Sequence, residues 1–378
     1  MKWRLALLVA ALATPALAQQ AANSGVEDLR PKDMQFDDNL GYQELPISPV
    51  PPELQVDNPN AADISTEIFG DKVDPAYGAY QRGYYLTALE FALPRAEKGD
   101  RAAQTLIGEI YADGLGVAQD KTKAATWYEA ASKNGDPLAT FALAMMYQNG
   151  EGVEKDRKKA ADLFLRAADA GNMMAKYNLG LLYIEGNVVE PNLVKAAGLI
   201  GKAAASGIPE AQYDYGSMLM EGAGVAPDPA AAAEQFRLAA ESGLAAAQVD
   251  YATLLYLGRG VTQDRVASAS WYARAADAGN PVAQNRYAKL LAAGEGVERD
   301  LETAAMYRAL ARRQGLTDGQ LDGLLGKVTP DVIAKAEERA RFWPLPPPTR
   351  VAEAEVPAAP APVDVPDAPE APVETPAP

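Results

Sequence analysis

The sequence predicts an all-α fold, an α-solenoid of helix-turn-helix repeats with disordered, proline-rich segments on either side. Two series of glycines and the composition of the chain ends support this prediction. One glycine turn recurs six times at an interval of 36 residues, beginning at Gly114, Gly150, Gly186, Gly222, Gly258 and Gly294. A second series with the same interval comprises Gly99, Gly135, Gly171, Gly207, Gly243, Gly279 and Gly315. A fixed period between about 20 and 50 residues is typical of stacked helical hairpins.

Residues 1–18 have the pattern of a secretory signal peptide. Lys2 and Arg4 precede an apolar run that is too short to span a bilayer, and the segment ends in the small-x-small sequence 16–18. We therefore expect cleavage before Gln19. The sequence contains no cysteine, so it has neither a lipid-attachment site nor a disulfide. We expect the mature chain in the periplasm of a Gram-negative bacterium, with secretion as the alternative, and without an integral membrane segment.

The formal net charge of −16 is concentrated outside the repeats. Residues 19–74 contain 12 acidic and 3 basic side chains, and the tail 344–378 contains 6 and 1. We expect 19–73 to be a disordered, acidic, proline-rich linker and 344–378 a disordered Pro/Ala/Glu-rich tail. Residues 75–343, with 33 acidic and 29 basic side chains, are nearly balanced. This composition offers no basic footprint for nucleic acid or anionic lipid.

Ordered structure is predicted to begin with a capping pair of helices over 74–99, followed by six repeats over 100–315. In the first repeat, Asp100 is placed to cap helix A, which ends at Gly114, and Asp120 to cap helix B, which ends at Gly135. The second cap recurs as Asp156, Asn192, Asp228, Asp264 and Asp300. Recurrence in every repeat indicates a structural role for these side chains and not an acid catalyst.

Small residues recur where the helices must approach closely. One position of helix A is occupied by Gly108, Ala144, Gly180, Gly216, Ala252 and Ala288. One position of helix B is occupied by Ala131, Ala167, Ala203, Ala239, Ala275 and Ala311. A large side chain at such a position is expected to overpack the contact, at a cost of about 1–3 kcal/mol.

The motifs of the repeat resemble the Sel1-like repeat, a relative of the tetratricopeptide repeat. The resemblance is carried by the segments 175–183 (AKYNLGLLY), 150–153 (GEGV) and 127–131 (WYEAA), and by Gly135, and it covers about residues 75–315. It implies a right-handed superhelix whose A helices line the concave face, and a role as a protein-binding adaptor. Some exported proteins of this kind regulate envelope sensors, which makes an envelope sensor or a cell-wall enzyme an expected partner.

The third repeat departs from the pattern. Its turn has Asn187-Val188 where the other repeats have x-Gly, and its helix B contains Gly198 and Gly201. Two glycines inside a helix cost about 1 kcal/mol each relative to alanine. The order of an aliphatic residue and a tyrosine in helix A also reverses between repeats three and four, from Leu179/Tyr183 to Tyr215/Leu219. We therefore predict that 186–201 is the weakest joint of the solenoid.

After Gly315 the period is lost, and residues 316–343 are predicted to form C-terminal capping helices. Thr329 is placed at the N-cap and Pro330 at the first position of the last helix. Leu321, Leu324 and Leu325 precede it, and the whole segment is expected to cover the open face of the sixth repeat.

The residue types argue against catalysis. The sequence has no histidine and no cysteine, which removes the usual general base, the usual zinc ligands and every Ser-His or Cys-His arrangement. The alternative function is a cell-wall hydrolase of the β-lactamase type, a label that some cysteine-rich Sel1-like proteins carry. This sequence lacks those cysteines and any Ser-x-x-Lys motif. We expect no enzyme activity, no cofactor and no metal.

A partner protein or peptide is the expected ligand of the concave groove. In a tetratricopeptide-like register, the middle repeats place an aromatic and methionine-rich surface there. The predicted groove residues are Phe141, Met145, Tyr177, Leu181, Ile184, Tyr213, Met220 and Tyr256. Two alternatives stay open: that the aromatic residues pack within their own repeats, and that the tail 344–378 is the docking element. The sequence does not indicate an oligomeric state.

Overall fold

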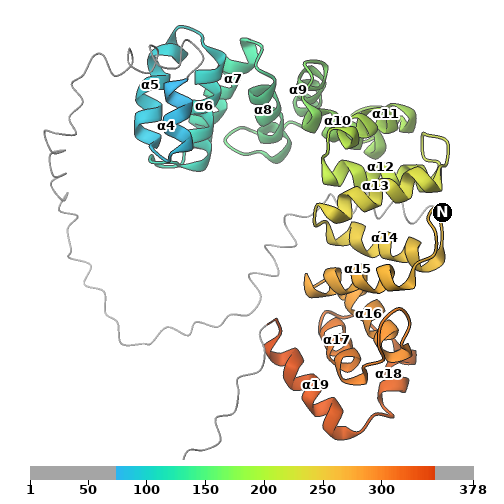
Figure 1. The fold of residues 1–378 in the computed structure, drawn as a ribbon. Coiled ribbons are helices and arrows are strands. Elements are labelled where there is room, and N and C mark those ends of the chain that lie inside the picture. Colours follow the sequence, from blue (N-terminus) through green and yellow to red (C-terminus); the bar gives the residue numbers. More distant parts are fainter. Residues whose placement is uncertain (1–73, 345–378) are drawn as a thin grey trace, which may run out of the picture.

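The computed structural model describes residues 74–344, which form sixteen helices and no strand. The predicted signal peptide 1–18, the linker 19–73 and the tail from residue 345 onward lie outside the described residues. The helices pair and stack into a curved array, a right-handed solenoid, which confirms the predicted fold class (Figure 1). Where the array bends, α8 and α10 lie on its inner side and α9 and α11 on its outer side (Figure 1).

Each repeat consists of two helices of 13 residues, helix A and helix B. The A helices are α6 (Arg101–Asp113), α8 (Pro137–Asn149), α10 (Met173–Glu185), α12 (Pro209–Glu221), α14 (Ala245–Leu257) and α16 (Pro281–Ala293). The B helices are α7 (Lys121–Lys133), α9 (Arg157–Asp169), α11 (Leu193–Ala205), α13 (Pro229–Glu241), α15 (Arg265–Asp277) and α17 (Leu301–Arg313). Before them lie α4 (Pro75–Gln81) and α5 (Tyr85–Glu97), and after them α18 (Gly319–Leu325) and α19 (Pro330–Phe342).

The ends of the helices follow from local side-chain chemistry. Every B helix begins at an Asp or Asn whose carboxylate or amide oxygen accepts a backbone N–H of the first turn, as Asp120 does from Lys123 at 2.9 Å. The predicted recurring cap is thus confirmed. Every A helix ends at a glycine in the left-handed conformation, with φ of 70° at Gly114. Thr329 occupies the N-cap of α19 as predicted, but its side chain makes no capping hydrogen bond.

The second glycine of each turn has a role that the sequence did not reveal. A Cβ at Gly152 would lie 2.3 Å from the carbonyl oxygen of Lys121, the first residue of the preceding helix B. The turn therefore rests directly on the preceding repeat, and a Cβ at Gly224, Gly260 or Gly296 would meet a carbonyl oxygen in the same way, at 2.0–2.1 Å. In the third repeat Val188 takes this place, and it packs with Val189 against the core of the second repeat.

In the first, third and fourth repeats, the glycine at the eighth position of helix A lies against a large side chain of helix B. A Cβ on Gly108 would lie 2.6 Å from the ring of Tyr128, and one on Gly180 would lie 2.6 Å from Cγ1 of Ile200. Ile200 at this contact is among the largest fully buried side chains. Large and small residues thus interlock within these repeats, as close packing of the interior requires.

The two glycines of α11 differ in their surroundings, which corrects the prediction that both merely weaken the helix. A Cβ on Gly198 would meet nothing within 4 Å, whereas one on Gly201 would lie 3.0 Å from the ring of Tyr215. Tyr215 is the first tyrosine of the reversed order, so Gly201 makes room for the change of shape between repeats three and four. Of the two glycines of α11, only Gly198 has no neighbouring side chain that requires a glycine.

Four A helices have a buried glutamine at their fourth position. The side-chain oxygen of this glutamine accepts a hydrogen bond in the first and last repeats but has no donor in the middle of the solenoid. Asn134 and Gln314, at the C-caps of α7 and α17, donate to Oε1 of Gln104 and Gln284 at 2.9 and 3.1 Å. The equivalent donors are absent for Gln212 and Gln248, whose Oε1 atoms are buried without a partner. Such an atom costs about 1–3 kcal/mol.

We predict that Gly198→Ala stabilises the protein by about 0.5–1 kcal/mol, because it removes a helix-interior glycine from an open position. Gly201→Ala on the same helix is the matched control, and we expect it to give no gain because the new methyl group meets the Tyr215 ring. Thermal unfolding measures both changes. Equal gains from both variants would contradict this packing argument.

Hydrogen exchange across α11 tests the predicted weak joint: protection as strong as in the other B helices would disprove it.

We predict that Ala278→Asn stabilises the protein by about 1 kcal/mol, since the new amide donates to the unpaired Oε1 of Gln248. Ala278 has φ −75° and ψ 2°, close to the −84° and 11° of Asn134, so the side chain fits without strain. Ala170→Asn is the matched control, because Ala170 has the same backbone conformation, φ −75° and ψ 3°, beside a repeat with Thr140 in place of glutamine. A rise in unfolding temperature shared by both variants would count against this explanation.

Candidate functional site

A partner can reach those of the second, sixth, ninth and thirteenth residues of each A helix that are exposed; Leu106, Leu181 and Asp214 stand at these positions but are buried. A period of 3.6 residues places these four positions on one side and the fourth, eighth and eleventh residues on the opposite side, where the eighth residue meets helix B. We call the side with the second, sixth, ninth and thirteenth residues the A-helix face. The groove residues predicted from the sequence stand at the fifth, ninth and twelfth positions, which places most of them on the flank of this face, towards the neighbouring A helix.

The structure buries two of the eight predicted groove residues. Tyr177 is 8% exposed and Leu181 is 7% exposed, and both belong to the core between repeats three and four. The other six, Phe141, Met145, Ile184, Tyr213, Met220 and Tyr256, are partly buried. Phe141 packs on Phe164 of its own repeat with a centroid distance of 5.8 Å, and Tyr213 packs on Phe236 at 5.4 Å. The alternative that aromatic residues at this position pack within the solenoid therefore describes Phe141 and Tyr213 as well.

Two of the tyrosines link consecutive A helices. The hydroxyl of Tyr177 donates to Oδ2 of Asp214 at 2.8 Å, and that of Tyr213 donates to Oδ2 of Asp250 at 2.9 Å. Each bond joins the fifth residue of one A helix to the sixth residue of the next. The two hydroxyls are committed to the junctions between repeats three, four and five.

Burial raises the pKa of Asp214 to about 6, although the hydrogen bond from Tyr177 lowers it, and the nearby Glu210 adds to the rise. The same burial, with the Asp214 charge, raises the pKa of Tyr177. A carboxylate so poorly hydrated is a weak point of the junction at neutral pH.

Tyr256 is also engaged within the chain. Its hydroxyl donates to Oε2 of Glu295 in the next turn at 2.6 Å, and this bond raises its pKa. The guanidinium of Arg265 lies over its ring at 5.3 Å from the centroid and 3.6 Å from the Glu295 carboxylate. Of the eight predicted residues, Met145, Ile184 and Met220 remain as partly exposed apolar side chains without a polar commitment.

The structure adds exposed apolar residues that the sequence analysis missed. Leu138 is 63% exposed on α8, and Met173 and Met174 are 36% and 41% exposed on α10. Together with the partly buried Met145, two turns further along α8, these side chains on two consecutive A helices are called the Leu/Met patch. The signal was available in the sequence, because Leu138 and Met174 stand at the same position of consecutive repeats, but the assumed register did not include that position.

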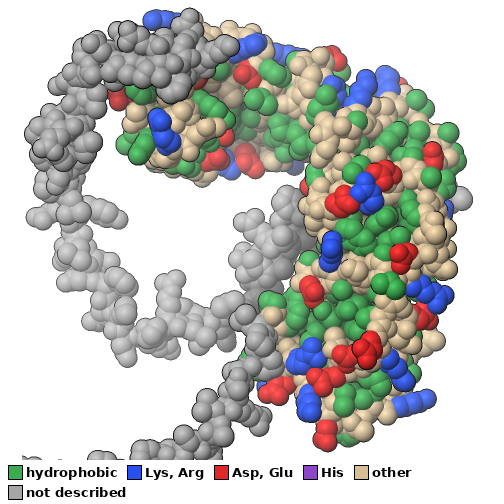
Figure 2. Space-filling model, viewed as in Figure 1, with side chains coloured by type: hydrophobic (Ala, Val, Ile, Leu, Met, Phe, Trp, Pro, Cys, Tyr) green, Lys and Arg blue, Asp and Glu red, His purple; other side chains and the backbone are tan. Residues whose placement is uncertain are grey.

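Charge is divided unequally between the two kinds of helix. The six A helices contain 7 acidic and 4 basic residues, whereas the six B helices contain 7 acidic and 15 basic ones. About half of the basic side chains on B helices are paired, as Lys121 is with Glu151 and Arg157 with Glu185. On the face shown in Figure 2, acidic and basic side chains accordingly stand together in small groups with hydrophobic surface between them.

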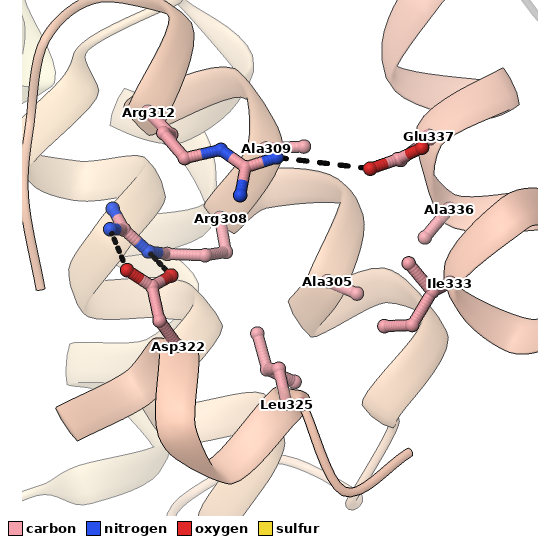
Figure 3. A pocket seen from close by; sticks show the side chains of 10 residues that line it. Ala305, Arg308, Ala309, Arg312, Asp322, Leu325, Ile333, Ala336 and Glu337 are labelled. Atoms are coloured by element: carbon pink, nitrogen blue, oxygen red, sulfur yellow. Dashed lines mark hydrogen bonds and ion pairs between the residues drawn. The ribbon is translucent and has the colours of Figure 1, made fainter. Parts of the chain in front are cut away.

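A small cavity of about 170 Å³ lies between α17, α18 and α19 (Figure 3). Arg308 on one side donates from Nε and Nη2 to the two oxygens of Asp322 at 2.6 and 2.8 Å, and Arg312 approaches Glu337 to 3.7 Å. Apolar side chains, among them Leu325 and Ile333, line the rest (Figure 3). Because both arginines are already paired, the cavity is a joint of the C-terminal cap and offers no free anion-binding group.

Metal and membrane contacts find no support in residues 74–344. No group of three or more acidic side chains is arranged there to hold a metal ion. No helix in this part of the chain has the length and apolar character needed to cross a membrane.

Comparisons with known proteins agree with this architecture. The Sel1 repeat model matches residues 101–136, 137–172, 174–208, 209–244, 245–280 and 281–316. A solved Sel1 repeat protein from Oxalobacter formigenes is 27% identical, with a TM-score of 0.56, over 64% of this chain and 97% of that chain. The protective antigen c5321 of uropathogenic Escherichia coli is 26% identical, with a TM-score of 0.49, over 75% of this chain and 74% of its own. Comparison with curated proteins gave no match.

We predict that Asp214→Asn removes a pH dependence of stability. Because the pKa of Asp214 is raised from 3.8 to about 6, its contribution is most favourable below the lower value and is lost as the pH rises through the higher one. The loss amounts to at most about 3 kcal/mol, since one pKa unit corresponds to about 1.4 kcal/mol. Denaturant unfolding at about pH 4 and about pH 7.5 should show this difference in the wild type and not in the variant.

Asp250→Asn is the matched control for this measurement. Its carboxylate accepts the same type of tyrosine hydrogen bond, but it is only partly buried, so we expect a smaller change. If Asp214→Asn retained the full pH dependence of the wild type, another group would be responsible for it.

Proposed function

The chain belongs to the Sel1 repeat family, and from this premise we propose that it is a non-catalytic scaffold that binds a partner protein on its A-helix face. Sel1 repeat proteins generally act as scaffolds for protein–protein interaction. The observation that carries the proposal for this chain is the Leu/Met patch. Adjacent exposed apolar side chains on a soluble surface mark sites of interaction, and methionine adapts to partners of irregular shape.

The composition supports a binding role over a catalytic one. The sequence has neither histidine nor cysteine, and Tyr177 and Asp214, whose pKa values are raised, are engaged in the junction between repeats three and four. No observation favours the alternative of a β-lactamase-type hydrolase.

We further propose that the partner is met in the periplasm, and that it is an envelope sensor or a cell-wall enzyme whose activity the scaffold regulates. The support for this location is the pattern of residues 1–18, with basic residues, an apolar run and a small-x-small end. The support for regulation is the resemblance to exported proteins of the same repeat family.

We predict that Leu138→Asp combined with Met174→Asp abolishes crosslinking of the full exported chain to its partner in living cells. Both side chains are exposed, so the change places charge on the proposed contact surface without removing core packing. Leu165→Asp combined with Val194→Asp is the matched control, because these residues are 45% and 71% exposed on B helices. Crosslinked products that persist in the first variant, or vanish equally in both, would refute the assignment of this surface.

A further inference from the structure

The A-helix face carries carboxylates and no basic side chain along the first five repeats. Its second, sixth, ninth and thirteenth positions include Glu109, Asp113, Glu185, Glu210, Asp214, Glu221 and Asp250. Basic residues occur at these positions only in the sixth repeat, as Arg286 and Lys289. The near balance of charge over the whole solenoid conceals this one-sided distribution.

Three of the carboxylates are available to a partner. Asp113, Glu210 and Glu221 are exposed and form no salt bridge with any of residues 74–344. The others are engaged within the chain: Glu109 accepts a hydrogen bond from Tyr80 at 2.9 Å, and Glu185 pairs with Arg157 at 2.5 Å. The negative charge of the face therefore has unpaired members that a partner could neutralise.

Glu210 stands at the second position of α12, as Leu138 and Met174 do on α8 and α10, whereas Asp113 and Glu221 stand at the thirteenth position, about 16 Å further along their helices. Asp113 belongs to α6, the patch to α8 and α10, and Glu210 and Glu221 to α12. Consecutive A helices are neighbours, as the hydrogen bond from Tyr177 on α10 to Asp214 on α12 shows. An occupant that covers Leu138 and Met174 and continues along the solenoid thus reaches Glu210, and one that also covers the last turns of the A helices reaches Asp113 and Glu221.

Charge excludes the other occupants that the chain itself could supply. Residues 19–74 contain 12 acidic and 3 basic side chains, and residues 344–378 contain 6 and 1, so both flanking segments are repelled by an acidic face. A second copy that docked with the same face would oppose carboxylates to carboxylates. A cationic partner is the occupant that matches the charge.

We propose that the A-helix face binds a cationic, amphipathic segment of a partner protein, with apolar side chains on the Leu/Met patch, a lysine or arginine beside Glu210, and further basic residues towards Asp113 and Glu221 in the last turns of α6 and α12. This inference rests on the proposed function and specifies the chemistry of its partner. Charge complementarity of this kind selects among partners and speeds their association, and it weakens as salt is added.

The test is selection of binding peptides from a phage-displayed library of random 16-residue sequences on the full chain. We expect the enriched peptides to combine leucine, methionine or aromatic residues with an excess of lysine and arginine. Their affinity, measured by fluorescence anisotropy of the best peptide, should fall at least about tenfold in Glu210→Lys combined with Glu221→Lys. It should also fall with rising salt.

Asp162→Lys combined with Asp169→Lys is the matched control. These two residues are exposed on the B helix α9, and the change alters the net charge of the chain by the same amount. Affinity that is nearly unchanged in this control supports the proposal. Equal weakening in both variants, enriched peptides without an excess of basic residues, or no enrichment at all would overturn it. Each of these results leaves the proposed function standing if Leu138→Asp with Met174→Asp still abolishes crosslinking.

Discussion

The solenoid depends on a contact seen in the first, third and fourth repeats, the insertion of a large helix B side chain into the space left by a helix A glycine. Tyr128 meets Gly108 in this way, and Ile200 meets Gly180, with no space for an additional methyl group. The contact fixes the distance and rotation of the two helices. It thereby decides which helix A positions point into the core and which form the A-helix face, so packing inside the repeat determines the binding surface outside it.

The period, the caps and the turns could be predicted from the sequence because each follows from local chemistry. Left-handed backbone requires glycine, and an Asp or Asn oxygen satisfies the first N–H groups of a helix, whatever lies nearby. The surface could not be predicted as well, because a rotation of a helix by less than one residue spacing decides whether a side chain is exposed. Tyr177 and Leu181 were therefore assigned to a groove, whereas Leu138 and Met174 on the true outward side were missed.

The same limit applies to contacts between repeats. Gly201 looked like a defect of the third repeat until the ring of Tyr215 was found above it. A glycine on one helix and a tyrosine on the next are a single adaptation, and no rule about helix propensity detects it. Gly198 has no such neighbour, so the interpretation from helix propensity, that this glycine weakens the helix, still holds for it.

Charge shows why a balanced composition says little about a surface. The numbers of acidic and basic residues over 75–343 are nearly equal, yet the A helices have more acidic than basic residues and the B helices have more basic than acidic ones. On the B helices, about half of the basic residues pair with acidic side chains, as Lys121 does with Glu151. On the A-helix face Glu185 pairs with Arg157, whereas the other acidic residues either bind tyrosine hydroxyls, which carry no charge to cancel theirs, or form no salt bridge within residues 74–344. Neutralisation of that face is consequently left to whatever molecule binds it, which gives a partner with basic side chains an advantage over one without them.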